Sequence, residues 1–289
     1  MPAPEITRFA PSPTGDLHLG HACAALFAHR AARETGGRFL VRMENLDGGR
    51  CEERYEAGIL GDLAWLGLDW EGPVRRQSEH LAEYRAALGV LEARGVVYPC
   101  FCTRGDIARE IEAMAGAPQG PDGPLYPGTC RALSPDERAA RLAGGATYAL
   151  RLDVGRAMTK LDALPLRFEE TGRGAAGDRG LIAVEPDLLG DIVLGRKDTG
   201  VSYHLAVVVD DADQGISLIT RGDDLFAATH VQRVLQALLG LPAPRYRHHP
   251  LVRDAQGRRL AKRDRDQTLA MLRAAGVTPE DIRQKLGLG

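Results

Sequence analysis

Two histidines three residues apart stand near the start of the chain, in the segment Arg8-Phe-Ala-Pro-Ser-Pro-Thr-Gly-Asp-Leu-His-Leu-Gly-His21. If a helix begins near His18, both imidazoles project from one side of its first turn. Unpaired backbone N–H groups and the positive end of the helix dipole face an anion there. Gly20 leaves the backbone open to a flat ligand. The segment therefore predicts a site for a nucleotide such as ATP, with phosphates at the helix start.

A late basic segment is a second candidate for phosphate chemistry. Lys262 stands in Leu251-Val-Arg-Asp-Ala-Gln-Gly-Arg-Arg-Leu-Ala-Lys-Arg263, where a cation would offset the charge that develops when a phosphate is attacked. The surrounding basic residues could also contact a nucleic-acid backbone, although a solvated basic surface explains the same charge. These residues are Arg245, Arg247, His248, His249, Arg253, Arg258, Arg259, Arg263 and Arg265.

Three stretches together resemble the glutamyl branch of the class I aminoacyl-tRNA synthetases. The first is the histidine segment with its preceding Arg8-to-Gly15 run. The second comprises Tyr203-His-Leu-Ala-Val-Val-Val-Asp-Asp211 and Gly215-Ile-Ser-Leu-Ile-Thr-Arg-Gly-Asp-Asp-Leu225, which match nearly residue for residue. The third is Arg259-Leu-Ala-Lys-Arg263, in the place of the family's Lys-Met-Ser-Lys-Ser loop, with Arg259 replacing a lysine and Ala261 a serine. The resemblance spans essentially the whole chain.

The resemblance implies that glutamate is activated by Mg-ATP. His18, His21 and Lys262 would stabilise the transition state, and the same three residues with Gly20 would bind ATP. Glutamate carries two carboxylates and one ammonium, which suit two arginines and one acid. Asn45 departs from the family, which usually has an acid after Glu44. By resemblance, the glutamate contacts are Arg8, Phe9, Ala10, Pro11, Ser12, Glu44, Tyr203 and Arg221.

Three cysteines and a tyrosine form a candidate metal site. Cys100-x-Cys102 is followed by Tyr126-x-x-x-Cys130, and thiols clustered in a loop-rich region favour a structural tetrahedral Zn²⁺. The resembled family carries such a site here with a tyrosine oxygen as the fourth ligand, which would be Tyr126. Cys23 and Cys51 lack partners at ligand spacing and are predicted to be packing residues.

The predicted elements that must position these residues suggest an α/β fold. Strands are expected at residues 6–10, 38–43, 205–209 and 216–220, and helices at 19–35, 54–66, 79–94, 135–142 and 229–239. By resemblance this is a Rossmann-like class I synthetase catalytic domain with a zinc-bearing insertion and a short helical C-terminal segment. The expected divisions are 1–98 and 191–240 for the two catalytic halves, 99–190 for the insertion, and 241–289 for the basic and helical end.

Composition limits the remaining possibilities. The 289 residues carry a net charge of −2 and 44% hydrophobic residues, which predicts a globular protein with a real core. The sequence lacks an apolar run of the roughly 18 residues that a membrane span needs. The five cysteines do not suggest a disulfide framework. We therefore expect a cytoplasmic protein without a membrane partner, as a monomer.

The acceptor is predicted from length and resemblance. Residues 264–289 after the lysine loop are too few for the helical anticodon-binding domain of ordinary glutamyl-tRNA synthetases. That combination resembles enzymes that transfer glutamate to queuosine at the wobble position of tRNA(Asp). Arg245, Arg247 and Arg253 are the candidates for contacting its phosphates. The alternatives are a truncated synthetase that charges a tRNA 3′ end, a catalytically silent paralogue that acts as a binding module, and a small-molecule nucleotidyltransferase.

Overall fold

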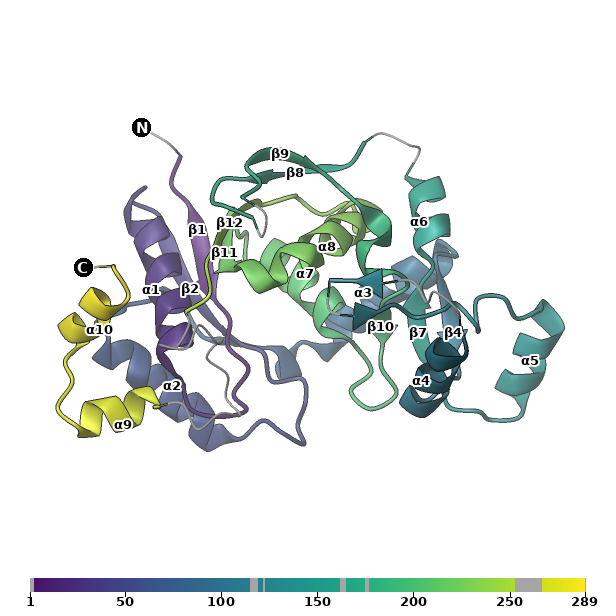
Figure 1. The fold of residues 1–289 in the computed structure, drawn as a ribbon, viewed down its shortest axis with the longest axis horizontal. Helices are drawn as coiled ribbons and strands as arrows, with labels where there is room; N and C mark the ends of the chain where they lie inside the picture. Colours follow the sequence, from purple (N-terminus) through teal and green to yellow (C-terminus); the bar gives the residue numbers. More distant parts are fainter. Residues whose placement is uncertain are drawn as a thin grey trace.

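The computed structural model describes residues 3–114, 119–121, 123–161, 165–174, 177–252 and 267–288. The described chain is elongated, with the C-terminal helices at one end and helix α5 at the other (Figure 1). None of its described helices has the length and apolar character that a membrane crossing requires.

The central sheet has the strand order of a doubly wound nucleotide-binding fold. Strands β1 (Ile6–Phe9), β2 (Arg38–Met43) and β3 (Arg75–Arg76) are parallel in the order β1-β2-β3. On the other edge of β1 lies β11 (Leu218–Gly222), because Ser217 N donates to the Ile6 carbonyl (3.0 Å) and Arg8 Nη1 to the Thr220 carbonyl (3.3 Å). The chain therefore runs outward from β1 in both directions, and β1/β11 is the point where the strand order reverses.

The sheet continues beyond β11 with strands from distant parts of the sequence. Strand β12 (Arg245–His249) is parallel to β11, and β8 (Arg167–Glu170) is parallel to β12 through the Tyr246–Glu170 pair. Strand β9 (Gly180–Ala183) is antiparallel to β8 and closes the edge. Strand β12 was not among the predicted elements.

The helices that surround the sheet lie close to the predicted residue ranges. Helix α1 (Leu19–Arg33) begins directly after His18, and α2 (Glu53–Trp65), α3 (Leu81–Ala93) and α8 (Phe226–Leu239) match three further predicted helices. Two short 3₁₀ helices, Gln77–Glu79 and Asp223–Leu225, precede α3 and α8.

The prediction of a strand at residues 205–209 is wrong. This β-branched run lies in helix α7 (Tyr203–Asp213), which packs among α3, α8 and β10. Leu205, Ala206, Val207 and Val208 are all buried, so the run shows no exposed face from which a helical period could be recognised.

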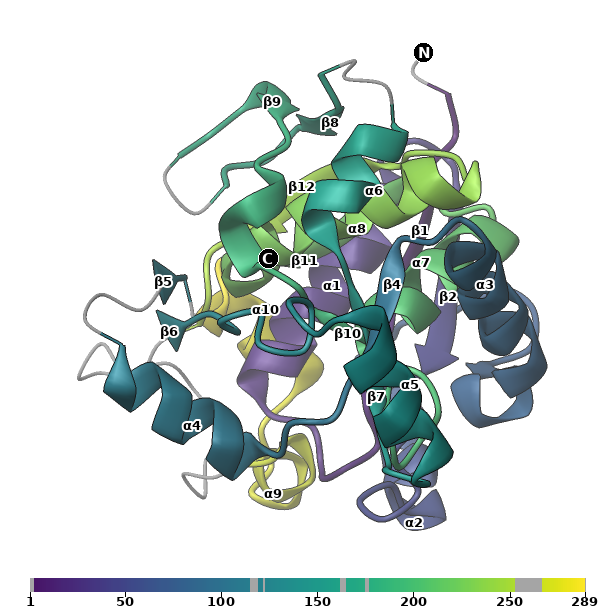
Figure 2. The ribbon, with the colours of Figure 1, turned by 90° about the vertical axis from the view of Figure 1, so that its right-hand side faces the viewer.

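A second, antiparallel sheet lies beside α3 and α7. Its order is β10 (Val193–Gly195), β7 (Ala149–Leu152) and β4 (Val97–Cys100). Figure 2 faces this end of the molecule, where the outlying elements gather. They are α4 (Arg104–Ala113), β5 (Gln119–Gly120), β6 (Gly123–Pro124), α5 (Pro135–Ala143), α6 (Val154–Lys160) and the 3₁₀ helix Pro186–Leu189.

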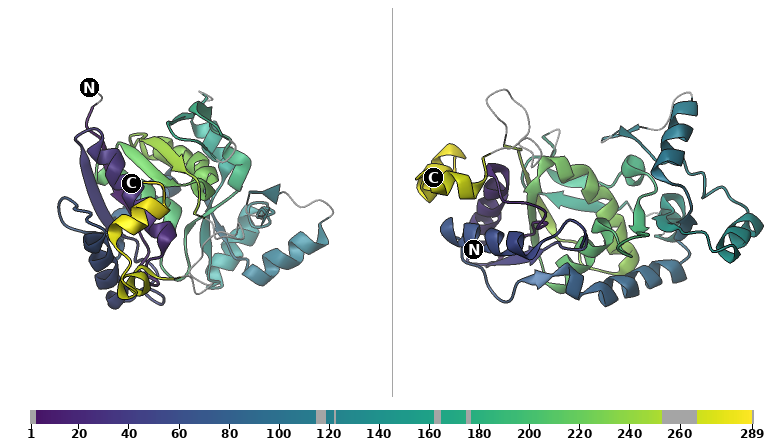
Figure 3. Two further views of the ribbon diagram at one scale, coloured as in Figure 1. Left: turned by 60° about the vertical axis from the view of Figure 1, so that its left-hand side comes forward. Right: turned by 90° about the horizontal axis from the view of Figure 1, so that it is seen from below.

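The C-terminal helices pack on the first half of the sheet. Helices α9 (Leu269–Ala274) and α10 (Pro279–Lys285) lie over α1 and α2, as the left view of Figure 3 shows. Leu269, Leu272 and Ile282 join the same apolar core as the buried face of α1. Leu269 N also donates to the Leu17 carbonyl (2.8 Å), so the chain returns to the start of α1.

Candidate active site and metal centre

A pocket of ≈ 640 Å³ opens at the carboxyl ends of β1 and β11, the reversal point of the sheet where such folds bind ligands. It contains every described residue that sequence analysis assigned to ATP or glutamate. These are Arg8, Phe9, Ala10, Pro11, Ser12, His18, Gly20, His21, Glu44, Tyr203 and Arg221. Residues from three separate parts of the chain are thus brought to one cavity.

His18 and His21 both use the Nδ1 atom inside the protein. His18 is the N-cap of α1, and its Nδ1 accepts from Gly20 N (3.0 Å), while His21 Nδ1 accepts from His18 N (3.2 Å). A neutral imidazole that accepts at Nδ1 carries its proton on Nε2. The rings lie 3.9 Å apart between centroids. Both histidines therefore offer Nε2–H donors of the kind that stabilise phosphate oxygens.

Gly20 has a role that spacing alone did not predict. A Cβ atom at this position would lie 2.9 Å from His18 Cε1 and 3.1 Å from His18 Nδ1. The His18 ring folds over the glycine to reach its N–H, so a side chain here would displace the imidazole.

Arg221 is buried with uncharged partners. Its Nη1 donates to Gln232 Oε1 (2.9 Å), its Nη2 to Thr229 Oγ1 (2.6 Å) and its Nε to His248 Nε2 (3.2 Å). The guanidinium also lies over the Tyr246 ring, 5.4 Å from the centroid. Among the described residues no carboxylate forms an ion pair with Arg221. A buried cation in this state favours an anionic ligand strongly, because its charge is poorly compensated.

Arg8 differs from Arg221 because it already has a carboxylate partner. Its Nε lies 3.0 Å from Asp211 Oδ1, and Arg42 Nη1 lies 2.8 Å from the same oxygen. Burial raises the pKa of Asp211, but the two guanidiniums outweigh it, and the net pKa lies below the usual range. Arg8 thus lines the pocket as half of an ion pair.

Glu44 is the acid of the pocket. Its Oε1 lies 3.3 Å from Arg42 Nη2, and its side chain is 10% exposed. Burial raises the pKa of the Glu44 carboxyl, while Arg42 and Arg8 oppose this shift. Burial also raises the pKa of Tyr203, and the Glu44 charge adds to it, so the phenol stays protonated beside this acid.

Much of the late basic segment, Lys262 and Arg253 included, lies outside the described residues. Its described flanks reach the pocket: Leu251 and Val252 line it, and Thr268 pairs with His18. Arg247 is paired with Glu34 at 3.2 Å. Arg245 is paired with Glu5, which precedes β1, so Arg245 lies at the amino-terminal end of the parallel strands, opposite the pocket.

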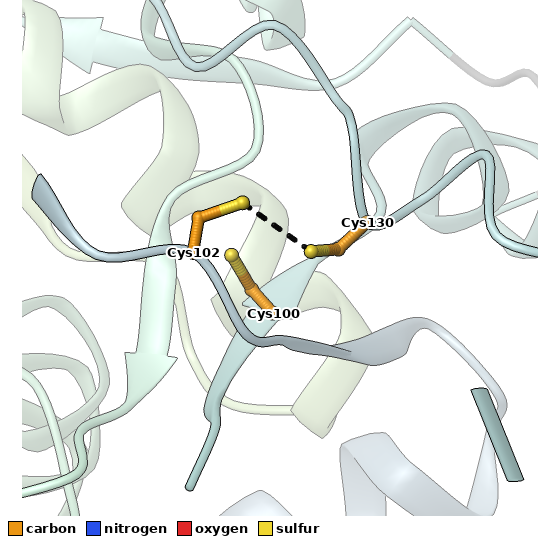
Figure 4. Close-up of side chains that lie close together, drawn as sticks. All are labelled: Cys100, Cys102 and Cys130. Atoms are coloured by element: carbon orange, nitrogen blue, oxygen red, sulfur yellow. Dashed lines mark hydrogen bonds between the residues drawn. The ribbon is translucent and has the colours of Figure 1, made fainter. Parts of the chain in front are cut away.

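Three thiols and a phenol converge at the end of β4, as Figure 4 shows for the cysteines. Cys102 Sγ lies 3.4 Å from Cys130 Sγ, and Tyr126 Oη lies 3.4 Å from Cys100 Sγ and 3.6 Å from Cys102 Sγ. Tetrahedral zinc bonds of about 2.3 Å place sulfur ligands a little under 4 Å apart. The spacing and the soft donor set therefore fit a small tetrahedral metal ion.

The family described as tRNA synthetases class I (E and Q), catalytic domain, matches residues 6–288. The chain belongs to this family. A glutamyl-Q tRNA(Asp) synthetase of Rhodobacter capsulatus is 50% identical over 98% of this chain and 100% of the relative. A protein of the same name from Nocardia farcinica is 46% identical, over 95% of this chain and 81% of its own length.

A solved structure of a glutamate tRNA ligase from Elizabethkingia meningosepticum, in complex with its amino acid, shares the fold of this class I synthetase. The TM-score is 0.72 at 28% identity, over 90% of this chain and 52% of the ligase. The chain therefore spans about half the length of that solved ligase. The predicted Rossmann-like synthetase fold is confirmed.

The charged residues behind the pocket of this synthetase were not predicted from the sequence. Asp210 and Asp211 lay inside a quoted motif and Arg42 inside a predicted strand, but none of the three was assigned a role. Fully buried Arg42 joins Glu44 to both aspartates. Charged residues inside apolar runs were the available signal, since a charge there is buried only when it is paired.

Proposed function

We propose that this chain activates L-glutamate with ATP and transfers the glutamyl group to queuosine of tRNA(Asp). One observation carries the activation step. A single pocket is lined by two imidazole Nε2–H donors at a helix start, by a buried guanidinium with uncharged partners and by the carboxyl group of Glu44. The two imidazoles suit phosphates, and the guanidinium together with the Glu44 carboxyl suits an acidic amino acid.

Glutamate recognition uses charge and hydrogen bonding. The Arg221 guanidinium binds a substrate carboxylate, Glu44 and Tyr203 face the ammonium, and the Arg8–Asp211 pair supplies further polar contacts. The residues from Phe9 to Ser12 form the wall between the glutamate and ATP subsites. All of these residues except Asp211 line the pocket.

The activation step is a displacement at phosphorus. An α-carboxylate oxygen of glutamate attacks the α-phosphorus of ATP, the new O–P bond forms as the bond to pyrophosphate breaks, and pyrophosphate leaves with the electron pair. The Nε2–H groups of His18 and His21 stabilise the charge on the phosphate oxygens without transferring a proton. Lys262 is proposed to act with them, and Mg²⁺ enters with ATP.

The acceptor assignment is supported by the relatives named glutamyl-Q tRNA(Asp) synthetase at 50% and 46% identity. A hydroxyl of the queuosine cyclopentene ring attacks the glutamyl carbonyl of the mixed anhydride and releases its proton to solvent. The C–O bond to phosphate breaks, AMP leaves, and an ester remains on the tRNA.

The cluster of Cys100, Cys102, Cys130 and Tyr126 is proposed to hold one structural Zn²⁺. A bound Zn²⁺ would crosslink the end of β4 and the segment before α5. The three thiolates and the phenolate would hold it, and Arg151, whose guanidinium lies 3.9 Å from the Tyr126 ring centroid, favours negative charge on the phenol.

Two assays test the proposal. ATP–pyrophosphate exchange that depends on glutamate, without tRNA, is expected from the purified protein. Transfer of labelled glutamate is expected to tRNA(Asp) that contains queuosine and not to the unmodified transcript. Equal labelling of both tRNAs would instead indicate charging of the 3′ end, and absence of exchange would indicate a silent paralogue.

A further inference from the structure

Behind Arg221 lies a buried pair that does not line the pocket. His248 Nδ1 is 2.5 Å from Glu170 Oε2, and both side chains are fully buried. His248 extends from β12 and Glu170 from β8, so two neighbouring strands meet behind the β11 residue Arg221. The activation mechanism leaves this pair without a role.

The contacts fix the protonation of His248. An arginine N–H can only donate, so the His248 Nε2 atom that faces Arg221 Nε at 3.2 Å must be an unprotonated acceptor. The ring proton therefore lies on Nδ1 and is donated to Glu170. Burial lowers the pKa of His248, which keeps the ring neutral.

Glu170 is held as a carboxylate by three N–H groups. Its Oε1 accepts from Gly172 N (2.7 Å) and His248 N (3.1 Å), and its Oε2 accepts from the His248 ring. Burial raises the pKa of Glu170, but these hydrogen bonds outweigh it and the net pKa lies below the usual range. The His248 ring therefore lies between the negative charge of Glu170 and the guanidinium of Arg221.

We propose that Glu170 and His248 are positioning residues for substrate glutamate, because they orient Arg221 through a fixed imidazole tautomer while leaving its charge available to a carboxylate. A direct Arg221–Glu170 pair would satisfy the guanidinium and compete with the substrate. The imidazole accepts the Nε–H without adding a negative charge. This inference rests on the proposed binding of glutamate at Arg221.

The substitution Glu170→Gln is the sharpest test. The two backbone N–H groups keep the amide oxygen at the Oε1 position, so the amide NH₂ faces His248 Nδ1. That ring atom must then accept, its proton moves to Nε2, and an N–H points at the Arg221 N–H. We expect the KM for glutamate in ATP–pyrophosphate exchange to rise about tenfold or more, as loss of a charged hydrogen bond implies. The KM for ATP should change less than about twofold, because its subsite is separate.

Glu169→Gln is the matched control, since it makes the same change on an exposed neighbour in β8. Nitrogen chemical shifts of the His248 ring should report the Nδ1–H tautomer in the wild type and in Glu169→Gln, and the Nε2–H tautomer in Glu170→Gln. Equal glutamate KM values for Glu170→Gln and Glu169→Gln would overturn the proposal. So would a rise in the KM for ATP in Glu170→Gln as large as the rise in its KM for glutamate.

Substitutions at His248 give an independent readout if Glu170→Gln does not fold. Gln at position 248 can place an amide oxygen near the position of Nε2 and is expected to keep the glutamate KM within about threefold of the wild type. Leu at the same position offers no acceptor and should raise it about tenfold. Equal values for His248→Gln and His248→Leu would reject the positioning role. Wild-type protein without glutamate-dependent exchange would instead reject the proposed function itself.

Discussion

At the scale of single residues, Gly20 and His18 depend on each other. The His18 ring caps α1 by accepting from Gly20 N, and only a hydrogen at Gly20 leaves room for it. The cap also fixes which imidazole nitrogen carries the proton. A glycine that spacing alone assigns to ligand approach therefore also orients an imidazole of the proposed ATP subsite.

The substitution Gly20→Ala is predicted to displace the His18 ring. We expect kcat/KM for ATP in pyrophosphate exchange to fall about tenfold or more, since an imposed shift of one transition-state donor costs at least this much. Gly61→Ala, in the exposed middle of α2, is the control. Its new Cβ meets no atom within 4 Å, so activity should be unchanged and stability should rise by about 0.5–1 kcal/mol. Unchanged kinetics in Gly20→Ala would show that the ring is not held by this contact.

At the scale of elements, helix α9 docks on α2 beside a buried carboxyl. Asp62 is 4% exposed, and its ion pair with Arg273 is long, at 3.7 Å. Burial raises the pKa of Asp62 to about 6, while Arg273 opposes the shift. An aspartate in an unfolded chain titrates near 4. The folded state binds the Asp62 proton more tightly than the unfolded chain does. The contribution of Asp62 to the free energy of unfolding is therefore highest below about pH 4 and is lost as the pH rises through 6.

The substitution Asp62→Asn should therefore stabilise the protein at pH 8, by about 2 kcal/mol, and have little effect at pH 4.5. Urea unfolding at the two pH values measures this difference. Glu53→Gln, an exposed change on the same helix, should have little effect at either pH. A less stable Asp62→Asn protein at pH 8 would mean that the Arg273 pair outweighs the burial of the charge.

The cysteine cluster belongs to the same scale, because it joins β4 to a later loop. Cys130→Ser is predicted to reduce bound zinc, measured by elemental analysis, from about one ion per chain to nearly none. Tyr126→Phe keeps three thiolates and should weaken zinc affinity about 10- to 100-fold. Cys51→Ser, which lies outside the cluster, should retain the metal. Wild-type affinity in Tyr126→Phe would exclude the phenol as a ligand.

Helix α7 shows why some elements could not be predicted. Local pattern assigns the Leu205–Val209 run to a strand because β-branched residues favour strands and the run is entirely apolar. Its burial among α3, α8 and the sheets overrides that preference. Helix α1 and strand β2, by contrast, were predicted well, since a glycine pair and a cap residue delimit them.

At the scale of the whole molecule, the sequence was sufficient to bring the pocket residues together but not to describe their charge state. Motif resemblance predicted Arg8 and Arg221 in one site, and in the structure both residues line the same pocket. Their difference is that Arg8 is paired with Asp211 while Arg221 has uncharged partners. The Arg8–Asp211 contact joins residues 203 positions apart, and the pattern of a single sequence does not reveal such a pairing.

The same long-range contacts join the two halves of the catalytic fold. Arg8 on β1 and Arg42 on β2 both meet Asp211 on α7. Arg42 also lies 3.4 Å from Asp210, which accepts a hydrogen bond from Tyr84 Oη at 2.7 Å on α3. The N-terminal strands are thus attached to a helix from the later half of the chain through buried charges.

The substitution Asp211→Asn removes the carboxylate that Arg8 and Arg42 share. Both buried guanidiniums then lose a negatively charged partner. We expect a loss of about 3–5 kcal/mol in the free energy of unfolding, measured by urea denaturation. Asp213→Asn on the same helix is the control, because Asp213 pairs with Arg75 but is 56% exposed, and its loss should cost at most about 1 kcal/mol. The pKa of Asp211 is lowered in the folded state, so its contribution is present above about pH 4 and disappears as pH falls. Equal destabilisation by the two variants at pH 7 would mean that the halves are held by apolar packing, with Asp211 contributing no more than a surface charge.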